Sequence, residues 1–545
     1  MKKKTPLAAL AMAGILGASI WLQPMTVWAD AWERSGNVYE MPDGTSIRGV
    51  LRRGIDVSHW QKDINWNQVK NDDVDFVMLG TRYKGQIDPN FRKNADAAYA
   101  AGVDLGAYIY SYATSVEMAE QEADFILDLV KDYPISYPIA FDAEDAGTLG
   151  TLPPEQVSAI INAFCKKIQD AGYYPMVYAN EYWLKNKIDV SSLNYDVWVA
   201  RYNVMYTYDS PAIWQATSTG SVNGIAGNVD IDFQFKDYSS IIPADTWRVI
   251  GGNRYYYQNH TMQKNTWIHD GAGWYYMNES GNPASGWQNF QDGTYYLEKD
   301  GKMTAGWKEL EGSRYYFKDS GRMATGWQQL DSTWFYLGED GKRRSGWQQI
   351  DGTWYYMNGE GKMLSGWQEI NGGRYYLGTD GRMATGWQQV DGIWYYMNGD
   401  GRMLSGWQEI NGSWYYLGTD GRMVTGWQHL DGKWYYLNSD GKMAVGWKQS
   451  GNTWYYMNRS GHMQTGWIEV DGALYYLNES GEMASNTVLE RNGVKYQASG
   501  NGACAEISAD STTAGEEGQK AEEGNTQTNS SSSQERGPAG PGSEM

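Results

Sequence analysis

The strongest constraint on the fold is a Gly-Trp pair that recurs every twenty residues, ten times without an insertion, from Gly286-Trp287 to Gly466-Trp467. Trp247 and Trp267 extend this register toward the N-terminus. Within most units an Asn-Gly or Asp-Gly pair separates two short aromatic and β-branched runs, which is typical of a β-hairpin. A single hairpin cannot bury its own apolar face. The repeats therefore predict an all-β solenoid of ~20-residue hairpins with an aromatic core.

An excess of tryptophan and tyrosine accompanies the repeats, because the chain has 27 Trp and 42 Tyr but only 10 Phe. One Tyr of each Tyr-Tyr pair is expected to pack against a neighbouring hairpin. Thin hairpins cannot hide all the remaining indole, so we expect some rings to face solvent. Flat aromatic faces at a fixed spacing can hold the apolar face of a sugar or enclose a quaternary ammonium by cation–π attraction. The array is therefore predicted to bind a ligand.

Each unit reads Gly-Trp, a turn, Trp-Tyr-Tyr, a second turn, and then Met before the next Gly-Trp. Over about residues 247–498 this pattern closely resembles the choline-binding, or cell-wall-binding, repeats of Gram-positive surface proteins, with related units in glucan-binding proteins. The resemblance implies a choline site between consecutive hairpins, formed by two Trp of one unit with a Tyr and a Met of the next. Two such cages would use Trp407, Trp414, Tyr436 and Met443, and Trp427, Trp434, Tyr456 and Met463.

The second Trp of the unit is missing at four positions. Arg314 and Arg374 replace it in two units, and Thr294 and Leu474 replace it in two others. An Arg beside an aromatic ring suits a sugar better than a cation. Choline is therefore favoured only modestly over glucan as the ligand of the array.

Between about residues 53 and 238 the pattern changes to apolar runs that alternate with helix-like stretches. We expect helices at 115–133 and 153–172, but the last three strands are too close in sequence for ordinary crossover helices. The expected strands are 54–60, 76–83, 105–113, 138–144, 175–180, 196–202, 212–217 and 230–235. The sequence therefore predicts an α/β fold, an eight-stranded β/α (TIM-like) barrel with a helix-poor last third and a site at the C-terminal ends of its strands.

Carboxylates gather at these predicted strand ends. Asp56 ends the first strand, the two-residue period puts Asp142 and Glu144 on one face, and Asp230 with Asp232 share a face of the last strand. Such a cluster of like charges is expected to keep at least one carboxyl protonated near neutrality. A protonated acid beside an ionised one is what cleavage of a glycosidic bond requires. No histidine other than His59 joins the cluster, so neither a metal nor a cofactor is expected.

Aromatic and amide side chains are expected to line a saccharide groove above the acids. Tyr110 shares a strand face with Tyr108 and Tyr112. Further members of the groove are Tyr178 with Asn180 on one strand and Trp198 with Tyr202 on another.

Five motifs carry a second resemblance: Gly54-Ile-Asp-Val-Ser-His-Trp-Gln61, the Asp142-Ala-Glu144 pair, Trp198-Val-Ala-Arg-Tyr202, Ile213-Trp-Gln215 and Val229-Asp-Ile-Asp232. Residues 53–238 resemble family 25 glycoside hydrolases, lysozymes that cleave the β-1,4 bond between N-acetylmuramic acid and N-acetylglucosamine. The resemblance implies that Glu144 is the general acid/base. Asp142 would act as nucleophile or would position the substrate acetamide to attack its own anomeric carbon. Asp56 and Asp230 would support the pair and bind sugar. We also expect Gln215 and Asp232 among the substrate-binding residues.

The ends of the chain have different compositions. Three lysines precede an apolar run at residues 7–22, which predicts a signal peptide over 1–29 and no stable membrane insertion after its cleavage. Residues 499–545 are polar and predict a disordered acidic tail. The remaining boundaries follow as linkers at 30–52 and 239–246, a catalytic barrel at 53–238 and repeats at 247–498.

The formal net charge of −20 argues against nucleic acid as a partner. The sequence as a whole predicts a secreted, cell-wall-associated peptidoglycan hydrolase, with peptidoglycan and a choline-bearing teichoic acid or other wall polysaccharide as partners. Two alternatives remain: a glucan- or wall-binding adhesin with an inactive barrel, and a hydrolase of another polysaccharide.

Overall fold

The structure, a computed structural model, describes residues 32–36 and 38–508. Within this range the chain divides into two compact units. The first contains the residues up to Gly306 with Asp319–Arg322, and the second contains Trp307–Lys318 and the residues from Met323 onward. The predicted signal peptide and the tail beyond residue 508 lie outside the described residues. No helix in the described part of the chain has the length and apolar character needed to cross a membrane.

Eight strands of the first unit form a closed barrel in the order β10-β11-β12-β13-β4-β5-β8-β9. Their bounds are β4 (Arg52–Val57), β5 (Phe76–Gly80), β8 (Asp104–Tyr110), β9 (Ile135–Asp142), β10 (Pro175–Asn180), β11 (Asp196–Ala200), β12 (Ile213–Gly220) and β13 (Val229–Gln234). All eight predicted strands are present. The prediction of an eight-stranded barrel followed by hairpin repeats is therefore confirmed.

The last barrel strand departs from the parallel arrangement of a β/α barrel. Strand β13 pairs antiparallel with both β12 and β4. Only residues 221–228 separate β12 from β13, and a parallel connection needs a crossover of a dozen or more residues. The short connection therefore reverses the strand, and the barrel is mixed.

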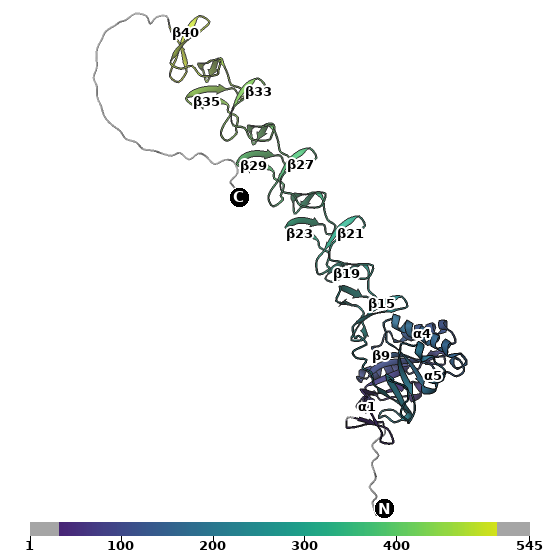
Figure 1. The fold of residues 1–545 in the computed structure, drawn as a ribbon. Coiled ribbons are helices and arrows are strands. Elements are labelled where there is room, and N and C mark those ends of the chain that lie inside the picture. The colour runs from purple at the N-terminus through teal and green to yellow at the C-terminus, as the bar shows by residue number, and fades with distance from the viewer. Residues whose placement is uncertain (1–31, 37, 509–545) are drawn as a thin grey trace, which may run out of the picture. The chain divides into compact units, whose positions relative to one another are not determined.

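Helices connect the earlier strands and cover the barrel (Figure 1). They are α1 (Trp66–Asn71), α2 (Phe91–Ala100), α3 (Val116–Val130), α4 (Pro154–Asp170) and α5 (Glu181–Asn186), with single turns η1 (His59–Gln61), η2 (Leu149–Thr151) and η3 (Val190–Ser192). The Ser115 side chain caps α3 by accepting a hydrogen bond from the backbone N–H of Met118. Pro154 opens α4, where its missing N–H leaves no helical hydrogen bond unmade.

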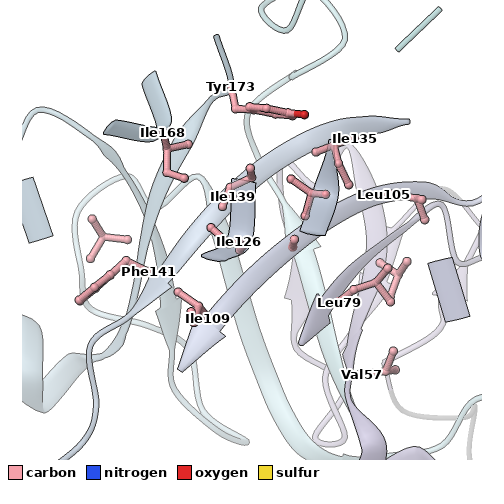
Figure 2. Close-up of a cluster of buried hydrophobic side chains, with 14 of the residues drawn as sticks. Val57, Leu79, Leu105, Ile109, Ile126, Ile135, Ile139, Phe141, Ile168 and Tyr173 are labelled. Atoms are coloured by element: carbon pink, nitrogen blue, oxygen red, sulfur yellow. The ribbon is translucent and has the colours of Figure 1, made fainter. Parts of the chain in front are cut away.

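The strand alternation separates two apolar layers. One side of each strand faces the helices, as Leu79, Ile109 and Phe141 do in Figure 2, which also shows Ile126 of α3 and Ile168 of α4. The other side fills the barrel, with a separate core of Phe76, Met78, Tyr137, Ala140, Met176, Tyr178, Trp198, Ala200, Ala212, Ile213, Tyr238 and Ile242. Along each strand, the residue next to one that points away from the barrel axis therefore points into the barrel.

The predicted linker at 30–52 is instead a small sheet of β1 (Arg34–Ser35), β2 (Val38–Glu40) and β3 (Ser46–Ile47). Trp32, Tyr39 and Ile47 are buried. The ring centroid of Trp32 lies 6.1 Å from that of Trp214, and the ring of Tyr39 lies 5.1 Å from that of Phe233. This sheet therefore covers β12 and β13, the part of the barrel wall for which no crossover helix was expected.

The first predicted repeat is part of the catalytic unit's core. Strands β14 (Thr246–Ile250), β15 (Asn253–Gln258) and β16 (Thr261–Met262) form a sheet that follows the barrel. The Arg248 guanidinium is buried between the rings of Tyr173 and Tyr257, 3.9 and 4.3 Å from their centroids. The hydroxyl of Tyr257 donates a 2.7 Å hydrogen bond to the carbonyl of Lys131. The predicted linker at 239–246 therefore does not separate two independent bodies, because buried residues follow it directly.

The remaining repeats form antiparallel hairpins whose strands are mostly five residues long. The pairs are β17–β18 (Thr266–His269, Trp274–Met277), β19–β20 (Gly286–Phe290, Gly293–Leu297), β21–β22 (Gly306–Leu310, Ser313–Phe317), β23–β24 (Gly326–Leu330, Thr333–Leu337), β25–β26 (Gly346–Ile350, Thr353–Met357), β27–β28 (Gly366–Ile370, Gly373–Leu377), β29–β30 (Gly386–Val390, Ile393–Met397), β31–β32 (Gly406–Ile410, Ser413–Leu417), β33–β34 (Gly426–Leu430, Lys433–Leu437), β35–β36 (Gly446–Ser450, Thr453–Met457) and β37–β38 (Gly466–Val470, Ala473–Leu477). In each hairpin turn the chain needs positive φ values, as at Asn411 (50°) and Gly412 (75°).

The array ends later than predicted. Strands β39 (Thr487–Arg491), β40 (Val494–Ala498) and β41 (Cys504–Glu506) join β37 and β38 in one five-stranded sheet. Cys504 pairs with both Leu474 and Ala498. The predicted tail boundary at 499 is therefore wrong by several residues, because a polar, glycine-rich segment still supplies an edge strand.

Candidate active site and repeat sites

Four acidic side chains come together at one end of the barrel. Asp56 lies near the C-terminal end of β4, Asp142 is the last residue of β9, and Glu144 follows two residues later. Asp230 lies near the beginning of β13 but is paired directly with Asp56. The reversal of β13 therefore brings Asp230 to the mouth, because its N-terminal end lies beside the C-terminal ends of the other strands.

The acids point inward because their sequence neighbours point outward. Ile55 and Val57 flank Asp56, and both belong to the layer between strands and helices. Phe141 and Ala143 flank Asp142 in the same way. Asp56 and Asp142 are each only 6% exposed, and Asp232, one step deeper in β13, is fully buried.

Hydrogen bonds link the predicted cleft residues to the acids. The hydroxyls of Tyr178 and Tyr202 donate to Oε1 of Gln215, at 2.7 and 2.8 Å. Nε2 of Gln215 in turn donates to Oδ2 of Asp56, at 2.6 Å. This chain fixes the orientation of the Gln215 amide and holds one oxygen of Asp56 in place.

Two other predicted residues contact different acids. The indole N–H of Trp198 donates to Oδ1 of Asp232 at 2.9 Å. The hydroxyl of Tyr110 donates to Oδ2 of Asp145 at 3.3 Å. Among the predicted cleft residues, Tyr110 is therefore oriented by an acid outside the predicted set.

Glu144 is held by the start of α5. The backbone N–H of Asn180 donates to Oε1 of Glu144, while the Asn180 side chain caps α5 by accepting from the N–H of Trp183. Burial raises the pKa of Glu144 above its usual value, and the hydrogen bonds from Asn180 oppose that shift. Burial is stronger, so the carboxyl holds its proton to higher pH than an exposed glutamate.

The remaining carboxyls also have raised pKa values. Burial and the charges of Asp230 and Asp232 raise the pKa of Asp56, and burial and the charge of Glu144 raise the pKa of Asp142. Burial raises the pKa of Asp230 to about 6. Oδ1 of Asp142 and Oδ2 of Asp232 are buried without a hydrogen-bond partner among the described residues. The site therefore combines shared protons with free acceptor atoms, which suits acid–base chemistry on a polar substrate.

An aromatic group at the mouth was not among the predicted site residues. His59 of η1 packs against Tyr83 with ring centroids 3.7 Å apart and the rings tilted by 38°, and its Nδ1 lies 3.0 Å from Oδ2 of Asp88. Trp60 is 73% exposed beside it. The Ser-His-Trp segment that directly follows β4 was the available signal, since loops after barrel strands line the mouth. No group of three or more His, Cys, Asp or Glu residues in the described ranges is arranged to hold a metal ion.

The repeats form sites of a different kind. In the second unit, a cavity of about 440 Å³ is lined by Trp407, Trp414, Tyr435, Met443, Arg459 and Ser460. A cavity of about 310 Å³ at Trp327 and Trp334 has Tyr355 and Met363 in the equivalent places. In the first unit, Trp267, Trp274, Tyr295 and Met303 line a cavity of about 380 Å³ together with Asp292, Asp319 and Ser320. Two Trp, one Tyr and one Met therefore recur around these three cavities.

The tyrosine of each predicted cage requires correction. The ring centroid of Trp407 lies 4.8 Å from that of Tyr435 in the next hairpin. The ring centroid of Tyr436 instead lies 5.1 Å from that of Trp427, its cross-strand partner in the same hairpin. Neighbouring strand residues point to opposite faces, so only the first Tyr of the pair reaches the preceding hairpin.

The same holds one repeat later. Trp427 lies 4.6 Å from Tyr455, and Tyr456 lies 5.1 Å from Trp447. Trp434 lies 6.3 Å from Trp427, and its carbonyl accepts a hydrogen bond from the N–H of Met463. The predicted tryptophans and methionine therefore come together, but Tyr456 belongs to the adjacent interface.

Comparison with known proteins agrees with both parts of this description. Residues 55–225 match the model for glycosyl hydrolases family 25. Six overlapping segments within residues 304–487 match a choline-binding repeat, and residues 265–282 and 285–303 match a cell wall binding repeat.

Two lysozymes each match about a third of this chain. An autolytic lysozyme from Clostridium acetobutylicum is 27% identical over 183 residues, 33% of this chain and 55% of the relative. Lysozyme M1 from Streptomyces globisporus is 28% identical over 198 residues, 33% of this chain and 66% of the relative. The chain thus spans little more than half the length of the first of these relatives.

The structure of CbpJ from Streptococcus pneumoniae TIGR4 is 32% identical, with a TM-score of 0.34, and the match covers 44% of this chain and 99% of CbpJ. The chain therefore combines a family 25 glycosyl hydrolase domain with C-terminal choline-binding repeats.

Proposed function

We propose that this protein is a secreted muramidase that cleaves the β-1,4 bond between N-acetylmuramic acid and N-acetylglucosamine in peptidoglycan. The observation that supports it best is the cluster of Asp56, Asp142, Glu144 and Asp230 at one mouth of the barrel, with raised pKa values for all four. Glycoside hydrolysis needs one protonated and one ionised carboxyl on either side of the scissile bond. A cluster that shares protons near neutral pH supplies both forms.

In this proposal Glu144 donates a proton to the leaving glycosidic oxygen and later accepts one from water. Burial raises the pKa of its carboxyl, which favours the acid form relative to that of an exposed glutamate. Asp142 either attacks the anomeric carbon or holds the substrate acetamide for that attack. Both roles use a carboxylate oxygen without another partner, and Oδ1 of Asp142 is such an atom among the described residues.

The remaining polar groups would bind the substrate. Asp56 is held by Gln215, so it presents a fixed acceptor to sugar hydroxyls. Tyr178 and Tyr202 orient the same amide. The exposed Trp60 offers an apolar face for a sugar ring at the rim.

The repeats would hold the enzyme on the cell wall. Each open cage of two Trp, a Tyr and a Met has the aromatic faces that attract a quaternary ammonium, so choline on wall teichoic acid is the proposed ligand. Several weak sites on one chain bind a multivalent wall more firmly than any single site does. Tethering would thus raise the substrate concentration around the barrel.

The test is the release of new reducing ends from purified peptidoglycan by the full chain and by Glu144→Gln. We expect muramic acid reducing ends from the wild type and a loss of about 10²- to 10⁴-fold in rate for the variant, because the general acid is gone. Mass spectrometry of reduced products identifies the new end.

The matched control is Glu155→Gln, which changes an exposed glutamate in the first turn of α4. It should leave the rate unchanged. If neither wild type nor control releases reducing ends from peptidoglycan, the muramidase proposal fails and a wall-binding protein remains. Release of N-acetylglucosamine ends instead would assign the other glycosidic bond.

A further inference from the structure

Two hairpins of the second unit carry an arginine at the position where most of the others have their second tryptophan. The Arg374 guanidinium lies 4.5 Å from the centre of the Trp367 ring, and that of Arg314 lies 4.8 Å from Trp307. Both distances are within the range of a cation–π contact. In the open cages a second tryptophan takes the place of the arginine. The ring centroids of the two indoles are then 6.1–6.4 Å apart.

The chain contains a natural matched pair for this difference. Residues 366–377 and 406–417 are identical except at two positions, where Gly373 and Arg374 correspond to Ser413 and Trp414. Arg374 is paired with Glu369 across the hairpin, as Trp414 is with Glu409. The backbone is therefore the same, and the side chain over the first tryptophan differs.

The rest of the Trp367 cage is complete. Tyr395 of the next hairpin lies 4.8 Å from Trp367, as Tyr435 does from Trp407. The N–H of Met403 donates to the carbonyl of Arg374 at 2.8 Å, and the N–H of Met443 donates to that of Trp414 at 2.7 Å. The Trp367 cage therefore differs from the Trp407 cage at one wall, where a positive charge on the ring face replaces the second indole.

We propose that Arg374 and Arg314 act as built-in cations that close their cages to a quaternary ammonium, so that the array consists of open and self-occupied sites. The guanidinium uses the ring face that choline would use. A second cation brought to the same face also meets a like charge at close range. The inference rests on the proposed choline binding of the open cages.

The cage at Trp307 is altered twice. Arg343 stands where the other cages have Met, and its N–H donates to the carbonyl of Arg314 at 2.8 Å. Its guanidinium donates to the carbonyl oxygens of Glu360 and Gly359, at 2.6 and 3.2 Å. Burial and the nearby Arg314 lower the pKa of Arg343. This site therefore carries two arginines and should stay closed when only one is replaced.

The first and last hairpin sheets show the same contact. In the first unit Arg254 lies 4.1 Å from the centre of Trp247, and in the second unit Arg491 lies 5.6 Å from Trp467. Closure by arginine is therefore a repeated feature of the array.

The experiment counts choline bound per full-length chain by equilibrium dialysis with radiolabelled choline. Arg374→Trp should bind one choline more than the wild type, and the converse Trp414→Arg should bind one fewer. Arg314→Trp should leave the number unchanged, whereas Arg314→Trp combined with Arg343→Met should add one. Near-ultraviolet circular dichroism checks that each variant keeps its aromatic packing.

The outcomes separate this inference from the proposed function. No choline bound by the wild type would overturn choline binding as a function of the array, and this inference with it. If the wild type binds choline and Trp414→Arg loses a site, but Arg374→Trp gains none, the inference alone is wrong. Arg374→Ala distinguishes removal of charge from repair of the cage, since a gain with Ala as large as with Trp would show that charge alone closes the site.

Discussion

Asp56, Asp142 and Asp232 of the barrel are almost fully buried and share one protein interior. The second tryptophans of the hairpins in the second unit, such as Trp334, Trp414 and Trp434, are 39–44% exposed and belong to separate hairpins. In the barrel, each carboxyl changes the pKa of its neighbours. In the repeats, each cavity is lined by neighbouring repeats only, as Trp407, Tyr435 and Arg459 of three successive repeats show.

This difference teaches how each region should respond to substitution. Residues that act as one electrostatic group lose function together, and their effects are not additive. Sites built from repeated local contacts contribute nearly independently, and the array loses one site at a time. The cage at Trp367 carries an arginine, yet the cages at Trp387 and Trp407 keep their pairs of indole rings. This agrees with sites that form independently.

The largest expected effect is on catalysis. Asp142→Asn should lower the rate of peptidoglycan cleavage by about 10²- to 10³-fold, because a buried charge that the transition state needs is lost. The same variant should bind as many choline molecules as the wild type. Reducing-end release and equilibrium dialysis on one preparation measure both quantities. A variant that loses choline sites as well would show that the two regions are not independent.

The next effect is on stability and its dependence on pH. The pKa of Asp230 is about 6 in the folded barrel, whereas an ordinary aspartate, as in the unfolded chain, has a pKa of 3.8. The folded state therefore holds this proton more tightly. Its contribution to the free energy of unfolding therefore falls as pH rises from about 4 to 6 and stays low above that. Asp230→Asn should raise the barrel's stability at pH 7 by roughly 1 to 3 kcal/mol and flatten this decline.

Thermal unfolding from pH 4 to pH 7, followed by circular dichroism of the helical signal, measures this prediction. The helices belong to the first unit, so the signal reports on the barrel. Asp209→Asn, an exposed acid, serves as the control and should keep the wild-type slope. An unchanged slope in Asp230→Asn would mean that another carboxyl of the cluster carries the shared proton.

The smallest effect is local to one repeat. Gly461 has φ of +78°, and a Cβ there would lie 2.2 Å from Sδ of Met443. Gly446 has a similar φ of +75° but open space around its Cβ position. Gly461→Ala should therefore destabilise its hairpin by about 0.5 to 1.5 kcal/mol more than Gly446→Ala does, because only the former pushes the Met443 side chain off its rotamer.

Hydrogen exchange of backbone amides in residues 433–477 measures this local opening. The rate of peptidoglycan fragment cleavage should be unchanged in both variants. Equal exchange in the two variants would show that backbone conformation, and not contact with the methionine, limits the stability of the repeat.

The sequence was sufficient to predict what depends on periodicity. The eight barrel strands, the hairpins and the convergence of Asp142 with Glu144 follow from alternation and spacing. The adjacent Tyr435 and Tyr436 could not be distinguished in this way, because one-residue shifts in strand phase exchange the two faces. Their assignment needed the register of the hairpin, in which Tyr436 is opposite Trp427.

Other parts of the fold depend on contacts far apart in sequence. The strands of residues 34–47 are two or three residues long and have no visible period. What orders them is the packing of Trp32 and Tyr39 against Trp214 and Phe233, about 180 residues away. The position of Asp230 likewise depended on the direction of β13, which spacing alone did not reveal.

The burial of Arg248 between Tyr173 and Tyr257 also bears on how such proteins exchange parts during evolution. A recombination event between residues 238 and 246 would replace β14 and β15 together and leave Tyr173 of the barrel without the Arg248 guanidinium. A crossover after Met262 would transfer this sheet together with the barrel. We therefore expect that the inherited module consists of the barrel and its first hairpin sheet, and that later hairpins are the units that lineages gain and lose.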